Sequence, residues 1–296
     1  MDGFVATDLH GHSLFSDGKA SPEEYVAHRA ERGFEVIALS DHDTFAGVPR
    51  AAASAEARGL VLVPAMEASS FIHFGDPDAE QIHILAYFPP SMLVDGSLWR
   101  TVVARRAGEL HRRWREHILT WLDGLSPWDA EPLDPHGDLR TRVGAEFPAL
   151  QSMIELVHQC NRVLLPRFHA HQRRFLDDAE LFGWTPEELI EVIRADGALD
   201  VVAHAARARD RGRLQSLLDF ASGVEAYTSR HQPGYAAELR AWAEANGKHW
   251  TASSDDHQRG TYAHPPCGTP RRTVERILAG SPVGHGVART EARASA

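Results

Sequence analysis

Short apolar runs alternate with amphipathic stretches through the first third of the chain, and this pattern predicts strands and helices in turn. The segment Ser21-Pro22-Glu23-Glu24 combines an N-cap, a proline at the first helical position and a capping-box glutamate, so a helix is expected from here to Gly33. An alanine-rich stretch predicts a second helix at residues 48–58. The apolar runs predict four strands, at residues 4–9, 34–39, 60–65 and 81–88.

The alternation returns in the last third of the chain. Thr185-Pro186-Glu187-Glu188 repeats the capping-box signature and begins a helix that should end at Gly197. Further strands are expected at residues 198–203, 223–227 and 249–253, and further helices at 213–221, 234–246 and 271–278. Strict alternation of this kind predicts an α/β fold whose parallel sheet, with crossover helices, is either closed into a barrel or open and doubly wound.

Between residues 89 and 184 the alternation stops. This stretch is too long for a plain loop, and residues 98–122 and 147–157 have helical spacing of their apolar positions. We therefore expect a sheet domain formed by residues 1–88 and 185–283, an inserted helical subdomain at 89–184, and a loose tail at 284–296.

The insert carries several arginines that could bind phosphate or lie in solvent, namely Arg105, Arg106, Arg112, Arg113 and Arg115. Glu109 and Glu116 lie four residues after Arg105 and Arg112, a spacing that favours ion pairs along a helix. A solvated, ion-paired face is therefore the favoured interpretation.

Composition narrows the classes of function. The 296 residues carry a formal charge of −10, which argues against binding of long nucleic acid but leaves small anionic substrates open, because bound cations would reverse the local sign. The two cysteines, Cys160 and Cys267, indicate neither a disulfide framework nor a thiolate zinc site. No basic leader and no apolar run of about 18 residues is present, so we expect a cytoplasmic protein that does not enter a membrane. The oligomeric state is left open.

Histidine is the unusual residue, with 18 in the chain. His10 and His12 follow the first predicted strand in D-L-H-G-H, where the two-residue period directs both imidazoles to one side. The other candidates lie at or just past strand ends, except His83, which lies inside its strand; they are Asp17, Asp41, His42, Glu67, His204, Asp255 and His257. In barrels and open sheets alike, sites form where the parallel strands end.

Imidazole and carboxylate groups without thiolates suit zinc, manganese or iron, and a carboxylate can bridge two ions. The candidates exceed the needs of a single ion. A site with more than one divalent metal is therefore expected, since two ions about 3.5–4 Å apart can hold a bridging hydroxide as the nucleophile for phosphoryl transfer.

The motifs D-L-H-G-H-S-L-F-S-D-G, S-D-H-D-T, A-M-E, I-H-I-L-A-Y-F, V-V-A-H and S-S-D-D-H occur in an order that resembles the polymerase and histidinol phosphatase (PHP) family of metal-dependent phosphoesterases. The resemblance covers residues 1–88 and 185–260. It implies a distorted (β/α)7 barrel, in agreement with the seven predicted strands, with up to three metals at its rim.

The resemblance also implies a distribution of ligands. His10, His12, Glu67 and Asp255 would hold one metal, and Glu67 would bridge to a second metal held also by His83 and His204. The third metal would be held by Asp17, His42 and His257, which are also the catalytic candidates together with His231. Asp8 and Asp41 are expected to orient ligating imidazoles. Ala65, Ala205, Asp256 and Gln258 depart from residues frequent in the family, without removing a ligand.

Phosphate binding requires further cations. Arg207, Arg209 and His231 stand where the family keeps such groups, and surface ion pairing is an equally open interpretation for each. His231 is also a candidate to protonate the leaving group. The remaining histidines, for example His28, are expected to be structural or exposed.

We expect a metal-dependent phosphoric ester hydrolase that acts on a small phosphomonoester, favouring a nucleotide or a nucleoside bisphosphate. One alternative is an exonuclease on short oligonucleotide ends, with Trp99, Trp114, Trp121 or Trp128 as stacking surfaces, although helical spacing places Trp114 and Trp121 more naturally in a core. A histidinol-phosphate-type phosphatase, a metal-binding module without turnover and a C–N hydrolase also stay open.

Overall fold

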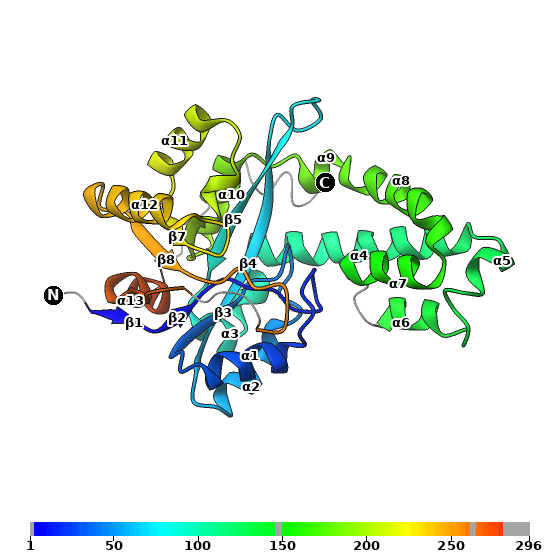
Figure 1. Cartoon of the computed structure of the whole chain (residues 1–296), viewed down its shortest axis with the longest axis horizontal. Helices are drawn as coiled ribbons and strands as arrows, with labels where there is room; N and C mark the ends of the chain where they lie inside the picture. The colour runs from blue at the N-terminus through cyan, green and yellow to red at the C-terminus, as the bar shows by residue number, and fades with distance from the viewer. Residues whose placement is uncertain (1–2, 146–149, 261–264, 281–296) are drawn as a thin grey trace.

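The computed structural model describes residues 3–145, 150–260 and 265–280. Figure 1 shows a sheet wrapped by helices at one end of the molecule and a group of helices extending away at the other. The predicted tail at 284–296 lies outside the described residues, as do His264 and His285.

Seven strands form one sheet, nearly closed into a barrel, in the order β2-β3-β4-β5-β6-β7-β8. They are β2 (Thr7–Asp8), β3 (Val36–Leu39), β4 (Val61–Ile72), β5 (Glu80–Tyr87), β6 (Leu199–Val202), β7 (Gly223–Tyr227) and β8 (His249–Ala252). The neighbours pair in parallel except at β5, which is antiparallel to both β4 and β6. The expected α/β barrel is therefore confirmed, and the expectation of an entirely parallel sheet is wrong.

The direction of β5 follows from its connection. Residues 73–79 join β4 to β5 as a hairpin without a crossover helix, so the chain returns antiparallel. The apolar pattern contains no sign of this, because β4 continues to Ile72, seven residues beyond the predicted end at 65.

The first predicted strand is divided. Phe4–Val5 forms β1, which pairs antiparallel with β9 (Thr269–Pro270), and only Thr7–Asp8 joins the main sheet. At the other edge, β8 forms no ladder with β2 among the described residues. In the described ranges the strand pairing between the two sides is limited to an isolated bridge between Gly11 and Asp256, so this edge is an open seam of the barrel.

Helices cover the outside of the sheet: α1 (Pro22–Glu31), α2 (Val48–Glu56), α10 (Pro186–Ala195), α11 (Arg211–Phe220), α12 (Pro233–Ala245) and α13 (Arg271–Ala279). Both predicted capping boxes are present, Ser21 with Glu24 and Thr185 with Glu188. Ile37, Ile84 and Trp250 are fully buried in an apolar cluster shared with these helices, and Leu9, Leu85 and Tyr87 are fully buried in a second apolar cluster.

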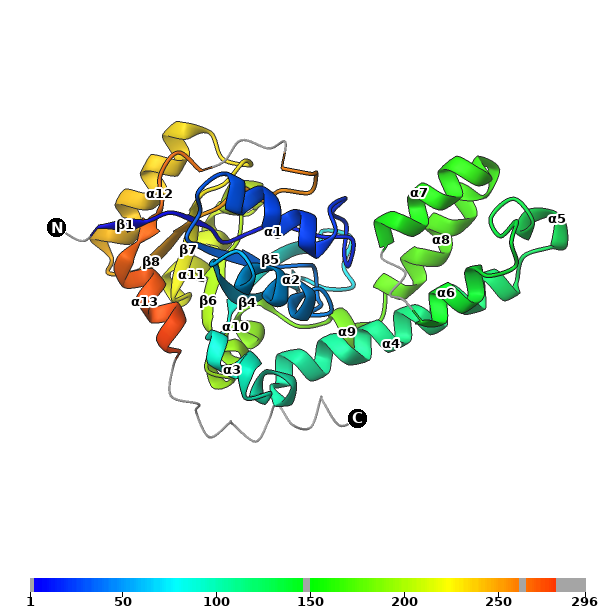
Figure 2. The ribbon, with the colours of Figure 1, turned by 90° about the horizontal axis from the view of Figure 1, so that it is seen from below.

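The stretch between β5 and α10 is helical (Figure 2). It contains α3 (Pro90–Val94), η1 (Ser97–Arg100), α4 (Val102–Asp123), α5 (Pro127–Ala130), α6 (Leu139–Ala145), α7 (Leu150–Cys160), η2 (Arg162–Leu164), α8 (Leu165–Leu176) and α9 (Ala179–Phe182). The start of the helix predicted at 147–157 falls on residues 146–149, which lie outside the described residues. Trp114, Ile118, Trp121 and Phe168 belong to an apolar cluster distinct from that of the barrel.

The arginines of α4 fall into two groups, one at the surface and one buried. Arg112 forms the predicted surface ion pair with Glu116, whereas Glu109, expected to pair with Arg105, pairs with Arg112 and Arg113. Arg106 instead is buried, with 7% of its side chain exposed, and donates hydrogen bonds to the carbonyl oxygens of Ser69 and Leu181. The prediction of a solvated face is therefore wrong at Arg106, which fastens the insert to β4.

The separate apolar cluster of the insert leads to a prediction. Replacing the fully buried Ile118 by alanine should lower the free energy of unfolding by about 2–5 kcal/mol, because it leaves a cavity in that cluster. The metal content should stay at the wild-type value, since the candidate ligands lie in the barrel. Urea unfolding followed by elemental analysis checks both, with the exposed Val163→Ala as control. Loss of metal in Ile118→Ala would contradict the independence of the two parts.

Candidate metal centre

The loop after β2 brings the first two histidines together. The backbone NH of Asp255 donates to the His10 carbonyl oxygen, and that of His12 donates to the Asp256 carbonyl oxygen, each at 2.9 Å. The two side chains are fully buried, and their Nε2 atoms lie 3.2 Å apart. The predicted convergence of these two imidazoles is therefore observed.

Glu67, 1% exposed, lies at the centre of the cluster. Its Oε1 atom lies 2.7 Å from both His83 Nδ1 and His204 Nε2. Its Oε2 atom lies 3.1 Å from His10 Nε2, and 3.2 Å from both His12 Nε2 and His42 Nδ1. The two oxygens of one carboxylate thus face two different groups of imidazoles, which is the arrangement that a bridging ligand needs.

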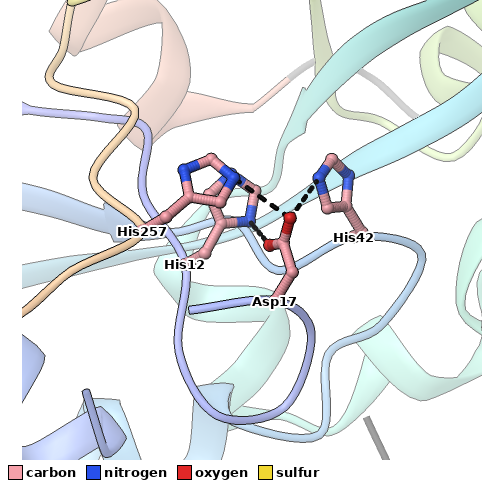
Figure 3. A group of neighbouring side chains, drawn as sticks. All are labelled: His12, Asp17, His42 and His257. Carbon is pink, nitrogen blue, oxygen red and sulfur yellow. Dashed lines mark ion pairs between the residues drawn. The ribbon is translucent and has the colours of Figure 1, made fainter. Parts of the chain in front are cut away.

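A second carboxylate gathers histidines nearer the surface. Figure 3 shows Asp17 facing His12, His42 and His257. The Asp17 oxygens lie 3.5 Å from His12 Nδ1, 3.6 Å from His42 Nε2 and 3.2 Å from His257 Nε2. Because His12 faces Asp17 through Nδ1 and Glu67 through Nε2, it lies between the two groups.

Asp255 completes the cluster from the other side of the seam. Its Oδ1 atom lies 3.6 Å from His10 Nε2, 3.3 Å from His12 Nε2 and 3.4 Å from His257 Nδ1. Asp255 and His204 both have positive φ values, 54° and 27°. Such backbone costs roughly 1–3 kcal/mol per residue and persists where the surrounding structure enforces it, as at functional sites.

The position of His83 follows from the direction of β5. The parallel strands reach the rim at their carboxyl ends, whereas β5 runs the other way and reaches it at its amino end. His83, near the start of β5 and opposite Ser69 on β4, therefore reaches the same rim from inside its strand.

The donor set fits divalent metal ions. Among the residues that the structure describes, three groups of side chains each place their donor atoms within 4.8 Å of one another: His12, Asp17, His42 and His257; His10, His12, Glu67 and Asp255; and His42, Glu67 and His83. Two donors about 2.0–2.2 Å from one ion lie about 3–3.5 Å apart, close to the separations observed here. The donors are nitrogen and oxygen atoms without thiolate, which suits zinc, manganese or iron.

Burial and neighbouring charges shift the pKa values of these groups. Burial alone would lower the pKa of His12, but Asp17, Asp255 and Glu67 outweigh it and raise that pKa to about 10. Burial alone would raise the pKa of Glu67, but the nearby histidines, chiefly His83 and His10, outweigh it and hold that pKa well below its usual range. Burial lowers the pKa of His42 to about 4. Protons on buried imidazoles thus balance the carboxylates where ions would otherwise do so.

Glu225 on β7 is a buried acidic residue that the sequence motifs did not single out. This fully buried carboxylate lies 2.9 Å from His10 Nδ1, and it accepts hydrogen bonds from the Ser253 hydroxyl and the His204 backbone NH. It therefore orients His10, the role that ligating imidazoles require of a carboxylate. The feature of the sequence that could have identified Glu225 is its position as an acidic residue within the apolar strand G-V-E-A-Y.

The two carboxylates expected in that orienting role have other contacts. Asp8 accepts hydrogen bonds from the backbone NH and hydroxyl of Ser254. Asp41 accepts hydrogen bonds from the backbone NH and hydroxyl of Ser13 and from the hydroxyl of Ser16, which lies 3.4 Å from His12 Nδ1. Asp41 thus reaches His12 through a serine.

Arg230 is a cation of the site that the sequence motifs also did not single out. Its Nε donates to Asp255 Oδ2 at 2.5 Å, and its Nη2 lies 3.4 Å from His257 Nδ1.

The neighbouring His231 contacts the backbone of two other segments. Its Nδ1 lies 2.9 Å from the Ala226 carbonyl oxygen, and its Nε2 accepts a hydrogen bond from the Ala206 NH. Both ring nitrogens are engaged, so the geometry favours a structural role for His231 over proton transfer or phosphate binding.

The two predicted phosphate-binding arginines differ. The Arg209 guanidinium donates to the carbonyl oxygens of Asp78 and Ala79 and so holds the β4–β5 hairpin. Arg207, in η3 (Ala205–Arg207), is exposed and lines a cavity of about 250 Å³ beside His83 and His204.

A larger cavity of about 860 Å³ opens beside Asp17, His42 and His83 and extends to the insert. Its apolar wall contains Phe71 and Phe74 from the β4–β5 hairpin and Trp114, Phe175 and Phe182 from α4, α8 and α9. Trp114, expected in a core, thus packs in the insert cluster and also lines this cavity.

Comparison with known proteins identifies the family. A model of the PHP domain matches residues 8–231, well over half of the chain. The chain belongs to the PHP domain family. The resemblance carried by the motifs is therefore confirmed.

Two curated relatives match this PHP chain over very different lengths. A 3',5'-nucleoside bisphosphate phosphatase from Chromobacterium violaceum is 27% identical over 268 residues, covering 86% of this chain and 87% of the relative. A 5'-3' exoribonuclease from Haemophilus influenzae is 44% identical over 63 residues, 21% of this chain and 23% of the relative. With the family membership, they confirm the predicted class, a metal-dependent phosphoester hydrolase.

Two solved structures share the fold. A chain from Bifidobacterium adolescentis, provisionally described as a metal-dependent phosphoesterase, has a TM-score of 0.62 at 21% identity and covers 96% of this chain and 98% of its own. A Chromobacterium violaceum protein described as an amidohydrolase has a TM-score of 0.59 at 21% identity, covering 98% of this chain and 97% of its own.

Within the described part of this PHP chain, none of the helices has the length and apolar character needed to span a membrane.

The protonated imidazoles give a pH prediction. Since the pKa of His12 is raised to about 10, an entering ion must displace a proton at neutral pH, so affinity for Mn²⁺ should rise with pH, by about tenfold per unit for each proton released. Calorimetry at about pH 6 and about pH 8, in buffers of different ionisation enthalpy, measures both affinity and proton release. Equal affinity at both pH values without proton release would contradict this assignment.

Proposed function

We propose that this PHP-family chain removes a phosphate from a nucleoside bisphosphate or a related small nucleotide. The observation that carries the proposal is the juxtaposition of the buried donor cluster with the large aromatic-walled cavity. The first can hold the ions that phosphomonoester hydrolysis requires, and the second can hold a nucleoside beside them.

We assign two or three divalent ions, of Mn, Zn or Fe, to the cluster. His10, His12, Glu67 and Asp255 would hold the first, and Glu67, His83 and His204 the second. Asp17, His42 and His257 would hold the third. Such ions would supply an activated water and neutralise charge on the phosphate oxygens.

The residues around the cluster prepare this arrangement. Glu225 fixes the ring of His10 with Nε2 toward Glu67, and Arg230 holds Asp255 through Oδ2, which leaves Oδ1 facing the imidazoles. Asp17, one third exposed, lies where the cluster meets the large cavity, so a phosphate would approach from this side.

The large cavity supports a nucleoside as the remainder of the substrate. Phe71, Trp114 and Phe175 offer aromatic surfaces on which a base can stack, worth about 1–3 kcal/mol per base. A volume of about 860 Å³ suits a single small molecule better than a longer strand. The likeness to the nucleoside bisphosphate phosphatase over 86% of this chain agrees with this interpretation.

The second candidate function is an exonuclease acting on ends of short oligonucleotides, supported by the local match to the Haemophilus influenzae exoribonuclease. It ranks second because that match covers 21% of this chain.

A substrate panel tests the proposal. With Mn²⁺ present, we expect phosphate release from nucleoside 3',5'-bisphosphates to exceed that from ribose bisphosphates without a base by at least about tenfold in kcat/KM, since the base gains about 1.4 kcal/mol or more from stacking. Release of mononucleotides from short oligonucleotides at a higher kcat/KM would favour the exonuclease. Activity on none of these compounds would overturn the proposal.

Arg207 gives a sharper test of phosphate binding. It lines the small cavity that also contains His83 and His204, so it can meet the phosphate that is not being cleaved. We expect Arg207→Ala to raise KM for nucleoside bisphosphates about 10-fold or more, an interaction of about 1.4 kcal/mol, with a smaller effect on monophosphates. The surface Arg50→Ala, which loses an ion pair with Glu23, is the matched control. Equal KM values for Arg207→Ala and wild type would exclude Arg207 from substrate binding.

A further inference from the structure

The metal ligands lie on both sides of the open seam between β2 and β8. His10 and His12 belong to the β2 side, and Asp255 and His257 to the β8 side. β2 and β8 share no ladder in the described residues. The two sides are joined instead by the bridge between Gly11 and Asp256 with its adjoining backbone hydrogen bonds, and by hydrogen bonds from Ser254 to the Asp8 carboxylate. An ion held by ligands from both loops therefore depends on whatever fixes the width of this seam.

We propose that Arg29 is a positioning residue of the metal centre, which clamps the two sides of the seam and so sets the geometry of the ions held across it. The proposal rests on the proposed function, since it assumes ions at the assigned ligands. It concerns a residue that touches neither ions nor substrate.

Arg29, on α1, is completely buried behind the ligands. Its Nη2 atom lies 3.1 Å from Asp8 Oδ2, on the β2 side, and its Nη1 atom lies 3.3 Å from Asp256 Oδ2, on the β8 side. The guanidinium also stacks on the Tyr25 ring, 3.4 Å from its centroid. One planar cation thus connects two carboxylates from opposite sides of the seam and is itself held in place by an aromatic ring.

Each of these carboxylates fixes a loop that carries ligands. Asp8 accepts hydrogen bonds from the backbone NH and hydroxyl of Ser254, directly before Asp255. Asp256, between Asp255 and His257, accepts from the backbone NH groups of Gln258 and Gly260 at 2.8 and 3.0 Å. The orientation of Asp255 and His257 therefore depends on two buried carboxylates whose charge Arg29 balances.

Removing the Arg29 guanidinium would leave the Asp8 and Asp256 carboxylates buried near each other without a balancing positive charge. Breaking a buried pair is costly because the remaining charges stay out of water. The loops can relieve this cost by moving apart, and the ligands on them would move as well. Ions held by His10, His12, Asp255 and His257 should weaken, whereas the ion at Glu67, His83 and His204, which lies away from the seam, should not.

The experiment is Mn²⁺ binding to the full chain, by calorimetry and by elemental analysis after gel filtration. For Arg29→Met we expect affinity at the seam-spanning sites to fall about 10- to 100-fold, the range for partners that orient metal ligands. One Mn²⁺ should remain at wild-type affinity. Arg29→Lys should recover part of the loss, since an ammonium can neutralise the carboxylates but lacks the two-pronged geometry.

Further variants separate positioning from general loosening. Asp256→Asn keeps the shape of the clamp, and it decides the question if Arg29→Met does not fold by circular dichroism; it should weaken the same sites. Arg50→Met, which removes a surface arginine, should bind Mn²⁺ as wild type does. Arg29→Met should be additive with His83→Ala and non-additive with Asp255→Ala in Mn²⁺ affinity, because only the latter pair acts on the same ion.

Unchanged Mn²⁺ affinity and number in a folded Arg29→Met, and in Asp256→Asn, would overturn the proposal, as would equal weakening at every site. Wild-type protein that binds neither Mn²⁺ nor Zn²⁺ would overturn the proposed metal centre itself. That result is distinguishable from the first two because it appears before any substitution is made.

Discussion

The structure around the site depends on one constraint, the compensation of a buried carboxylate. Glu67 is 1% exposed, and its two oxygens face five imidazoles at 2.7–3.2 Å. An isolated charge at this depth would be very costly, so it requires positive neighbours, either protons on the histidines or metal ions. Bound ions would supply positive charge near both oxygens while leaving the imidazoles neutral. The cluster is therefore better compensated with bound metal than with protons alone.

Departures from a regular barrel create this cluster. A hairpin reverses β5, which brings His83 to the rim, and the extension of β4 past the rim places Glu67 within a strand rather than after one. The incomplete closure between β2 and β8 leaves room for two loops that carry ligands. The regular parallel strands, by contrast, provide the rigid support. The regular strands thus hold the site rigidly in place. The hairpin, the extension of β4 and the open seam allow additional ligands to reach it.

The insert adds a wall to the site without contributing to the donor cluster. Its helices have their own apolar cluster, and Arg106 joins α4 to the carbonyl oxygen of Ser69. This attachment holds Trp114 and Phe175 across the cavity from the donor cluster. In this arrangement the barrel carries the donor cluster, and under the proposed function the insert would contact the molecule attached to the phosphate.

The sequence alone determined the helices with their capping boxes, the seven strands and the rim on which His10, His12 and His42 gather, because these follow from local periodicity and from the ends of strands. Only the tertiary structure decided which groups support them. Glu225 reaches His10, and Arg29 reaches Asp8 and Asp256, from elements distant in sequence. Strand β5 reverses through a hairpin that resembles any other connection in the sequence pattern. The solvated face predicted for Arg106 was wrong for the same reason: the partners of a polar side chain are set by packing between distant segments, on which local patterns carry no information.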